Sequence, residues 1–445
     1  MRLPTLARRL VAVALAAIDP ERLVAEELAR RGDRDFGAVV ALGKAAAAMA
    51  RGAEPFLPPD CRRLLLRPHT SQALALPAWE ELSGGHPVPD AASVAAGERL
   101  FAWLAELAPG RPLLALVSGG ASAAVELPAT GITLADLAAT QRALLGGGVA
   151  IGGVNAVRKH LSRLKGGGAL RACSGPVLAL LLSDVPGDDP AVLASGPFAA
   201  DPATFGAALA ALSGLTVPAA VRAHLAAGAQ GELPETVKPG DPVLGRVETV
   251  LLAGVRTAGQ AVAATLRRLG FTVVEGDLAG EAAEVGAGSA GIVARGRALS
   301  GGRVALVLGG ETTVTLGAEA GRGGRNQELA LAAARALADG RDEEAVLALA
   351  TDGEDGPTAA AGAVVDGRSW EGMRQAGTDP DRALRRHDSH TALASIASSA
   401  GANGEPGLLL RTGPTGTNTA DLAVYLRVPQ DPRGERLAEW DSMPL

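Results

Sequence analysis

Short apolar runs alternate with alanine-rich segments of helical character along most of this chain. A glycine, a serine or a threonine follows each run directly. The clearest runs are 38–42, 113–117, 177–182, 304–308 and 345–350. Apolar runs of this length are typical of strands that are buried on both faces. Strands that alternate with helices indicate βαβ units. The sequence therefore predicts an α/β protein built on a parallel sheet.

The length of 445 residues allows two or three hydrophobic cores. Glycine and proline are concentrated at 213–246, which is typical of a domain boundary. We therefore expect a domain over 1–243 and a second, smaller α/β domain over 244–445, with the apolar run VETVLLAG as its first strand.

Composition excludes several function classes. The formal net charge is -6 and aromatic residues make up 2% of the chain, so it lacks the basic surface and the stacking side chains that nucleic acid requires. Two cysteines, Cys61 and Cys173, form neither a disulfide framework nor a zinc site. We expect a soluble protein of the cytoplasm that binds neither nucleic acid nor membranes.

The N-terminus imitates a signal peptide, because arginines precede the apolar run LVAVALAAI. Asp19 and Pro20 then form a helix start, and the segment that follows is amphipathic. Two packed helices therefore explain this region better than a cleaved leader. No apolar segment reaches the ~18 residues that a membrane helix needs.

Three carboxylates follow the apolar run that begins at Leu178, namely Asp184, Asp188 and Asp189. Ligands of open α/β sheets bind outside the carboxyl ends of the strands, so these acids occupy a position suited to chemistry. Carboxylate oxygens there suit Mg²⁺. The alternative is a polar turn, since Asp, Pro and Gly are also ordinary turn formers.

Two glycine turns follow other strands of the N-terminal half. Lys44 comes after Gly43 at the start of an alanine-rich helix, where backbone amides attract anions. Only four of the 42 basic residues are lysines, so an arginine would have been the default. Ser118, Gly119 and Gly120 form a second turn whose amides can approach a carboxylate or phosphate. The alternative for Lys44 is an ordinary surface lysine.

A basic segment, NAVRKHLSRLK at 155–165, places Arg158, Ser162 and Lys165 near one face of a predicted helix. Such a face could bind an anionic substrate. A solvated charged face is the equally weighted alternative.

The C-terminal half contains comparable features. Glu311 follows a strand and two glycines. A glycine- and arginine-rich segment at 321–325 precedes a helix that begins near Asn326, and Arg322 or Arg325 could bind a phosphate there with two parallel hydrogen bonds. Polar strand-end loops carry Asp352 and Asn418. The segment GAGSAG at 286–291 matches the dinucleotide fingerprint GxGxxG, but the residues before it are helical in character, so we expect these glycines to thin a packed helix.

Taken together, the ordered motifs carry a family resemblance. They are ALGKAA (41–46), SGGHPVPD (83–90), VSGGAS (117–122), NAVRKHLSRLKGG (155–167), LSDVPGDD (182–189), ASGP (194–197), GGETTV (309–314), GRGGRNQE (321–328), TDGEDGP (351–357) and GPTGTN (413–418). The chain resembles the glycerate 2-kinases that carry a MOFRL domain, over nearly its whole length. The resemblance implies a Rossmann-like N-terminal domain, a smaller MOFRL-type domain, and ATP- and Mg²⁺-dependent phosphorylation of D-glycerate to 2-phosphoglycerate in a cleft between them.

The resemblance also implies roles for particular residues. The family's functional lysine and arginine fall on Lys44 and Arg325, while Asp184 and Asp189 are candidates to hold Mg²⁺ or, for Asp189, to accept the hydroxyl proton. Two other function classes stay open. One is an NAD(P)H-dependent hydroxypyruvate reductase, and the other is a sugar-acid or nucleotide binder without turnover. The resemblance leaves the choice between a monomer and a homodimer open, and nothing is expected of the tail after Tyr425 beyond an extended end.

Overall fold

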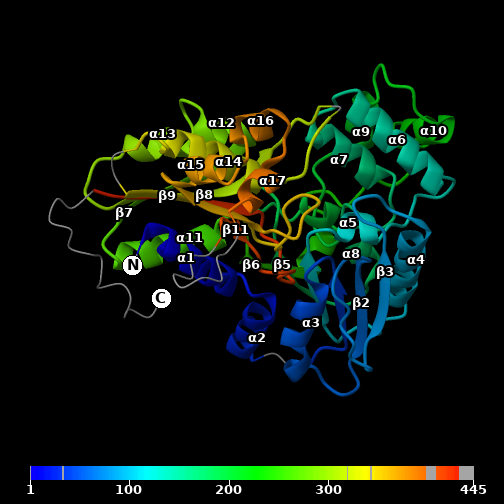
Figure 1. Cartoon of the computed structure of the whole chain (residues 1–445). Coiled ribbons are helices and arrows are strands. Elements are labelled where there is room, and N and C mark those ends of the chain that lie inside the picture. Colours follow the sequence, from blue (N-terminus) through cyan, green and yellow to red (C-terminus); the bar gives the residue numbers. More distant parts are fainter. Residues whose placement is uncertain (1, 33–34, 318, 341–342, 397–406, 430–445) are drawn as a thin grey trace. The chain divides into compact units, whose positions relative to one another are not determined.

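The computed structural model describes residues 2–32, 35–317, 319–340, 343–396 and 407–429 (Figure 1). The chain divides into two compact units. The N-terminal unit is Pro20–Gly254, and the C-terminal unit combines Val255–Leu445 with Met1–Asp19. No described helix has both the length and the apolar character needed to cross a membrane.

The N-terminal unit is built on a parallel sheet with the strand order β3-β2-β1-β4-β5-β6. Its strands are β1 (Ala38–Leu42), β2 (Arg62–Pro68), β3 (Glu80–Gly84), β4 (Leu113–Ser118), β5 (Val177–Leu182) and β6 (Val247–Ala253). Every residue of β1, β4 and β5 is buried, which explains their continuous apolar runs. The expected parallel sheet is confirmed.

The strand order reverses between β1 and β4, which lie side by side with Leu42 opposite Val117. This is the order of the doubly wound, Rossmann-like folds, in which ligands bind at the carboxyl ends of the two strands that flank the reversal. The topology therefore selects the turns after β1 and β4 as the candidate site.

Helices cover this sheet and form a second, smaller core. They are α2 (Pro20–Arg31), α3 (Ala46–Ala53), α4 (Ala91–Ala105), α5 (Ala121–Ala124), α6 (Leu134–Gly146), α7 (Ile151–His160), α8 (Gly168–Ala172), α9 (Phe205–Ala211) and α10 (Ala219–Ala229), with short 3-10 turns at Glu54–Phe56, Leu193–Ser195 and Pro242–Arg246. The main core joins the sheet to Trp103 of α4. The second core packs α7, α9 and α10 around Phe205.

The C-terminal unit has a mixed sheet with the order β11-β10-β9-β12-β8-β7. Its strands are β7 (Thr272–Glu281), β8 (Val304–Thr313), β9 (Glu343–Ala350), β10 (Gly362–Asp366), β11 (Leu409–Leu410) and β12 (Asp421–Val428). Only β7 and β8 pair in parallel among these described strands. The unit is thus α/β in composition, as expected, but its strands are mostly antiparallel.

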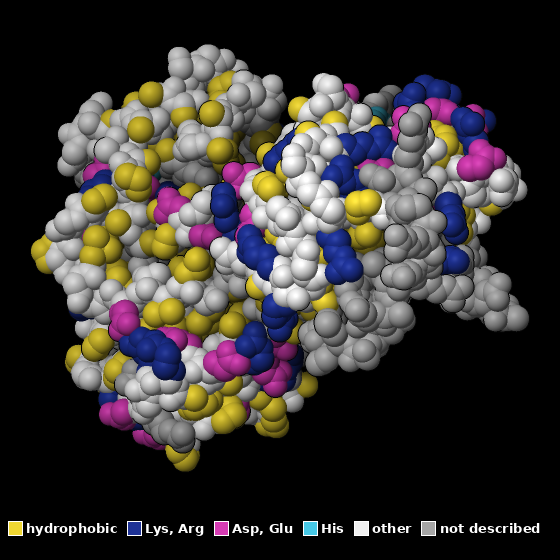
Figure 2. Space-filling model, turned by 90° about the vertical axis from the view of Figure 1, so that its left-hand side faces the viewer, with side chains coloured by type: hydrophobic (Ala, Val, Ile, Leu, Met, Phe, Trp, Pro, Cys, Tyr) yellow, Lys and Arg dark blue, Asp and Glu magenta, His cyan; other side chains and the backbone are white. Residues whose placement is uncertain are grey.

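Helices lie on both faces of the mixed sheet (Figure 1). One face carries α1 (Leu3–Ala17) and α11 (Thr257–Arg268), and the other carries α12 (Ala282–Ala287), α13 (Ile292–Arg297), α14 (Arg325–Leu337), α15 (Ser369–Gln375), α16 (Pro380–Arg385) and α17 (Ser389–Ala394). Figure 2, which views the molecule from the left-hand side of Figure 1, shows both basic and acidic side chains on that face. The central helix α14 is buried along most of its length.

Two sequence-based expectations differ from this architecture. The expected boundary at 243/244 lies eleven residues before the division at Gly254, because VETVLLAG forms β6 and pairs with β5 in the first sheet instead of opening the second domain. The two N-terminal helices do not pack as a pair. Helix α1 joins α11 and β9 of the C-terminal unit, whereas α2 packs on α3.

The GAGSAG segment lies where α12 packs against α14. A Cβ atom added at Gly286 would meet Ala332 Cβ at 2.8 Å and would also collide with the carbonyl oxygen of Leu329. Gly286 therefore permits close helix packing, as expected, and the segment is no dinucleotide turn.

We predict that Gly286→Ala destabilises the protein, because the added methyl group overpacks the α12–α14 contact at a cost of about 1–3 kcal/mol. Gly152→Ala in α7 is the matched control, since a Cβ there has no neighbour within 4 Å. Thermal unfolding should show a lower Tm for the first variant and an unchanged or higher Tm for the second. Equal melting temperatures would show that α12 and α14 do not pack so tightly.

Candidate active site

Lys44 lies in the turn between β1 and α3. Its predecessor Gly43 has φ +106°, and a Cβ there would lie 2.6 Å from both the Ser118 hydroxyl and the Gly119 carbonyl oxygen. Only glycine fits this position. The turn after β1 is therefore pressed directly against the turn after β4.

Ser118 holds the two turns together with its side chain. Its hydroxyl donates to the Leu42 carbonyl at 3.0 Å and accepts from the Ala45 amide at 3.0 Å. Only 1% of the residue is exposed. The Ser118 hydroxyl thus serves the framework, and any ligand contact from this residue would have to come from its backbone.

The turn after β4 brings a cation and a carboxylate to one place. Lys44 donates its amide to the Gly119 carbonyl at 2.8 Å. A Cβ on Gly120, which has φ +83°, would meet the Lys44 side chain at 2.9 Å, and a Cβ on Gly119 would collide with the Asp184 carboxylate. The structure therefore places Lys44, Gly119, Gly120 and Asp184 at the strand-order reversal.

His86 is a further member of this group that the sequence analysis quoted in a motif without nominating it. Its ring lies 3.5 Å from the position of a Cβ on Gly120. Burial and the Lys44 charge lower the pKa of His86, so the neutral imidazole is favoured. The only sequence signal for it was its place in SGGHPVPD.

The carboxylates after β5 have distinct surroundings. Asp184 is partly buried beside Gly119, whereas Asp189 is exposed and accepts the Ala191 amide at 2.8 Å. Asp188 has φ +53°, and its carboxylate faces Gly254. For Asp189 the local contact is the one a polar turn makes.

No group of three or more His, Cys, Asp or Glu side chains suited to a metal ion occurs in the described part of the chain. Mg²⁺ in phosphotransferases is commonly held by one or two carboxylates together with substrate phosphates and water. Asp184 and Asp189 supply hard oxygen donors on one loop at the strand ends. Their chemistry therefore fits a Mg²⁺ ion that arrives with a nucleotide.

Arg158 and Lys165 do not share a helix face. Helix α7 ends at His160, so Ser162 and Lys165 lie in the turn beyond it. Arg158 donates to the Ser122 hydroxyl at 3.1 Å, and Ser122 shares a hydrogen bond of 2.8 Å with Ser195. The predicted basic helix face is therefore wrong, because α7 ends before it reaches Ser162 and Lys165.

Lys165 is buried in an ion pair with Glu126, a residue that the sequence analysis missed. Burial lowers the pKa of Lys165, although Glu126 opposes this shift. No local pattern marks Glu126, because its partner is 39 residues away in the chain.

In the C-terminal unit, Arg325 is the first residue of α14. Its guanidinium forms a bidentate pair with Asp421 and a 2.7 Å bond with Glu311. Burial alone would lower the pKa of Arg325, but these carboxylates outweigh it and raise the pKa, so the charge is retained. Glu311 itself lies within β8, not in the loop expected after the strand.

The remaining candidates lie close to the start of α14 and in two loops. Asn326 is fully buried and donates its amide to Asp355, whose carboxylate also accepts from Gln327 and so caps the helix. Asp352 and Asn418 occupy strand-end loops, as expected, and their side chains accept backbone amides two residues further along the chain. These contacts are those of structural loop residues.

The Arg325–Asp421 pair leads to a stability prediction. Asp421 is 2% exposed, so Arg325→Met leaves a buried carboxylate without its cation at a cost of roughly 2–3 kcal/mol, discounted because Arg325 is itself 35% exposed. Burial raises the pKa of Asp421 from 3.8 to about 6 even in the intact pair. Asp421 is thus protonated more easily in the folded protein than in the unfolded chain. Because an unpaired charge exists only when Asp421 is deprotonated, the stability lost in Arg325→Met should grow as the pH rises through this range.

Denaturant unfolding at pH 4 and pH 7.5 measures this effect. The double variant Arg325→Met/Asp421→Asn should recover much of the loss and its pH dependence. A deficit that is equal at both pH values would show that Asp421 is not the group responsible.

Comparisons with known proteins show which family the chain resembles. A family model described as a domain of unknown function (DUF4147) matches residues 6–226, and the MOFRL family model matches residues 304–421. A protein of Pyrococcus horikoshii named glycerate 2-kinase is 36% identical over 94% of this chain and 96% of its own length. A putative hydroxypyruvate reductase of Agrobacterium vitis is 40% identical over 94% of this chain and 93% of its own length.

The crystal structure of a glycerate kinase from Thermotoga maritima superimposes with a TM-score of 0.83 at 35% identity, over 96% of this chain and 99% of that one. The residues matched by the two family models include Lys44 and Arg325. The chain therefore belongs to the glycerate 2-kinase family whose C-terminal part is a MOFRL domain.

Proposed function

We propose that this protein transfers the γ-phosphoryl group of ATP to the 2-hydroxyl of D-glycerate. The observation that carries the proposal is the convergence of Lys44, Asp184 and the Gly119–Gly120 turn at the strand-order reversal, in a chain whose relatives are named glycerate 2-kinases. In the reaction the glycerate oxygen bonds to the γ-phosphorus, the bond from phosphorus to the bridging oxygen breaks, and ADP leaves. The hydroxyl proton is released to a base.

Lys44 supplies positive charge where negative charge develops. A phosphoryl group in transfer carries charge on its outer oxygens, and catalysis consists mainly of positioning and electrostatic stabilisation. The Lys44 backbone is held by its bond to the Gly119 carbonyl, so its side chain starts from a fixed point beside the Gly119–Gly120 turn. The amides of Gly119 and Gly120 make no recorded hydrogen bond within the described chain, and they are suited to a phosphate or to the glycerate carboxylate.

Asp184 and Asp189 are the residues that would hold Mg²⁺, and the ion would supply positive charge to the nucleotide phosphates. Two groups are suited to accept the hydroxyl proton. Asp189 has an exposed carboxylate, and burial and the Lys44 charge lower the pKa of His86, which favours a neutral imidazole with a nitrogen free to accept a proton. Asp189 was nominated from the sequence and His86 by the structure.

Arg325 is suited to bind a phosphate or carboxylate group. Its guanidinium is 35% exposed and is oriented by Asp421 and Glu311. Because the two carboxylates already hold the side chain in one conformation, the arginine loses less conformational entropy when it binds a ligand. Arg158, which is held by Ser122, is a second candidate contact for a substrate anion.

The reductase alternative finds less support. A relative carries the name putative hydroxypyruvate reductase, but the GAGSAG segment begins at the end of α12, where Gly286 packs against α14, and does not follow a strand. A binder without turnover would be stabilised by ATP and glycerate and yield no product. A cytoplasmic location, small-molecule partners and a monomeric or homodimeric state complete the proposal.

The identity of the product tests the proposed function directly. With ATP, Mg²⁺ and D-glycerate, the product should be 2-phosphoglycerate, so enolase alone should convert it to a species that absorbs in the ultraviolet. A signal that requires added phosphoglycerate mutase would mean that the 3-hydroxyl is phosphorylated. NADH oxidation with hydroxypyruvate and no ADP release would favour the reductase instead.

A second prediction concerns Lys44. Lys44→Ala should lower kcat by roughly a hundredfold or more, the scale for removal of a preorganised charge, and should change Tm little. Lys44→Arg keeps the charge but substitutes a planar guanidinium for a compact ammonium, and we expect it not to restore the rate. Steady-state kinetics of both variants beside Arg142→Gln, an exposed arginine of α6, gives the comparison. Near wild-type turnover of Lys44→Ala would remove this residue from the mechanism.

A further inference from the structure

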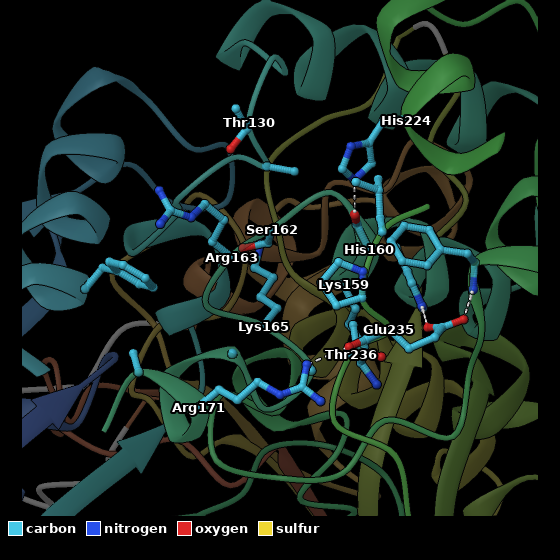
Figure 3. Close-up of a pocket in the computed structure, with 18 residues that line it drawn as sticks. Thr130, Lys159, His160, Ser162, Arg163, Lys165, Arg171, His224, Glu235 and Thr236 are labelled. Atoms are coloured by element: carbon cyan, nitrogen blue, oxygen red, sulfur yellow. Dashed lines mark hydrogen bonds and ion pairs between the residues drawn. The ribbon is translucent and has the colours of Figure 1, made fainter. Parts of the chain in front are cut away.

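The N-terminal unit contains a pocket that the proposed reaction does not use (Figure 3). Its volume is about 480 Å³, within the range of small-molecule sites. The walls come from the end of α7, the turn before α8, the loop at 129–130 and the segment 233–236. Lys44 is not among the residues that line it.

Two buried ammonium groups border this pocket. Lys159 is 5% exposed and Lys165 is 4% exposed. Within the described chain, each ammonium has one recorded acceptor, which is Asp201 at 3.1 Å for Lys159 and Glu126 for Lys165. An ammonium carries three N–H donors, and buried donors normally find acceptors. The two lysines therefore offer further donors at the pocket wall.

Arg163 adds positive charge at the rim. Its side chain lies over the ring of Phe101 at 4.2 Å. No carboxylate of the described chain forms an ion pair with it, in contrast to Arg171 on the same pocket, which is held by Asp241 at 2.9 Å. The charge of Arg163 is therefore available to a ligand.

The one carboxylate that lines the pocket is already engaged. Glu235 accepts from the Phe205 amide at 2.9 Å and from His160 at 3.0 Å, and it pairs with Lys238 at 2.9 Å. These donors lower the pKa of Glu235 against the effect of its partial burial. The positive charge of Lys238 also offsets the repulsion of Glu235 toward an incoming anion.

Apolar groups form the rest of the wall. Phe205, Leu233 and Ala129 line the cavity, while Thr130 and His224 add polar atoms to its wall. A bare inorganic ion would leave this apolar surface and most of the volume unfilled. The complementary ligand has a compact apolar body and one acidic group.

We propose that this pocket binds a small organic anion, a carboxylate or a phosphate monoester, whose acidic group is met by Lys165 and Arg163. Three of the four lysines of the chain lie in or beside it, since Lys238 pairs with the lining residue Glu235. The site is separate from the turns that carry Lys44. It therefore goes beyond the proposed kinase function and does not depend on it.

Isothermal titration calorimetry on the full chain tests the site with three probes of similar size: phenyl phosphate, benzoate and neutral benzamide. We expect at least one of the two anions to bind and benzamide to give no heat. The anion that binds more tightly identifies the class of the natural ligand: a phosphate monoester if it is phenyl phosphate, and a carboxylate if it is benzoate. No binding of either anion would overturn the proposal.

Matched variants locate the binding. Arg163→Gln should weaken binding of the anion at least tenfold. Thr130→Trp, which adds a bulky side chain at the pocket wall without a change of charge, should weaken binding as well. Arg142→Gln removes an exposed arginine that does not line the pocket and should leave the affinity unchanged. Circular dichroism melts verify that each variant is folded.

Two results contradict the assignment. One is an affinity that neither pocket variant alters. The other is binding that is lost in Lys44→Ala but kept in Arg163→Gln, which would place the probe at the candidate active site. Because heat of binding is measured rather than turnover, failure of the kinase assay would not bear on this result.

Discussion

The contact between the turns after β1 and β4 is the constraint on which the candidate site depends. The Ser118 hydroxyl bridges the Leu42 carbonyl and the Ala45 amide, and Gly43 lets the two backbones approach. A side chain at Gly119 or Gly120 would displace Asp184 or Lys44 from its position. A rigid junction between backbone turns thus positions a cation and a carboxylate at the edge of the sheet, which is what phosphoryl transfer requires.

Ion pairs between distant segments organise the remaining cations. Arg325 pairs with Asp421, Lys159 with Asp201 and Lys165 with Glu126, across 96, 42 and 39 residues of chain. Each acid is buried, so each cation is oriented by a partner that water does not screen. Such pairs lie both near the start of α14 and around the pocket that Lys159 and Lys165 line. Their stability contribution is modest, but loss of either partner leaves an unpaired buried charge.

Local patterns were sufficient for much of the fold and part of the site. Short apolar runs predicted β1, β4, β5, β8 and β9. Lys44, the Gly119–Gly120 turn and Asp184 were predicted as site residues because they follow such runs directly. Parallel strands present their carboxyl ends at one edge, so strand-end position is information that a sequence carries. The roles of these residues in catalysis stay predictions.

What the sequence by itself determined is therefore the α/β class, the parallel first sheet and the strand-end residues, because these follow from periodicity and short-range turn chemistry. Tertiary structure alone decided which unit receives β6 and α1, since strand pairing and helix packing are long-range choices. It also decided the partners of Lys165, Arg158 and Arg325, and the position of His86 beside Lys44. A buried charge finds its partner through the folded backbone, and no spacing along the chain records that choice.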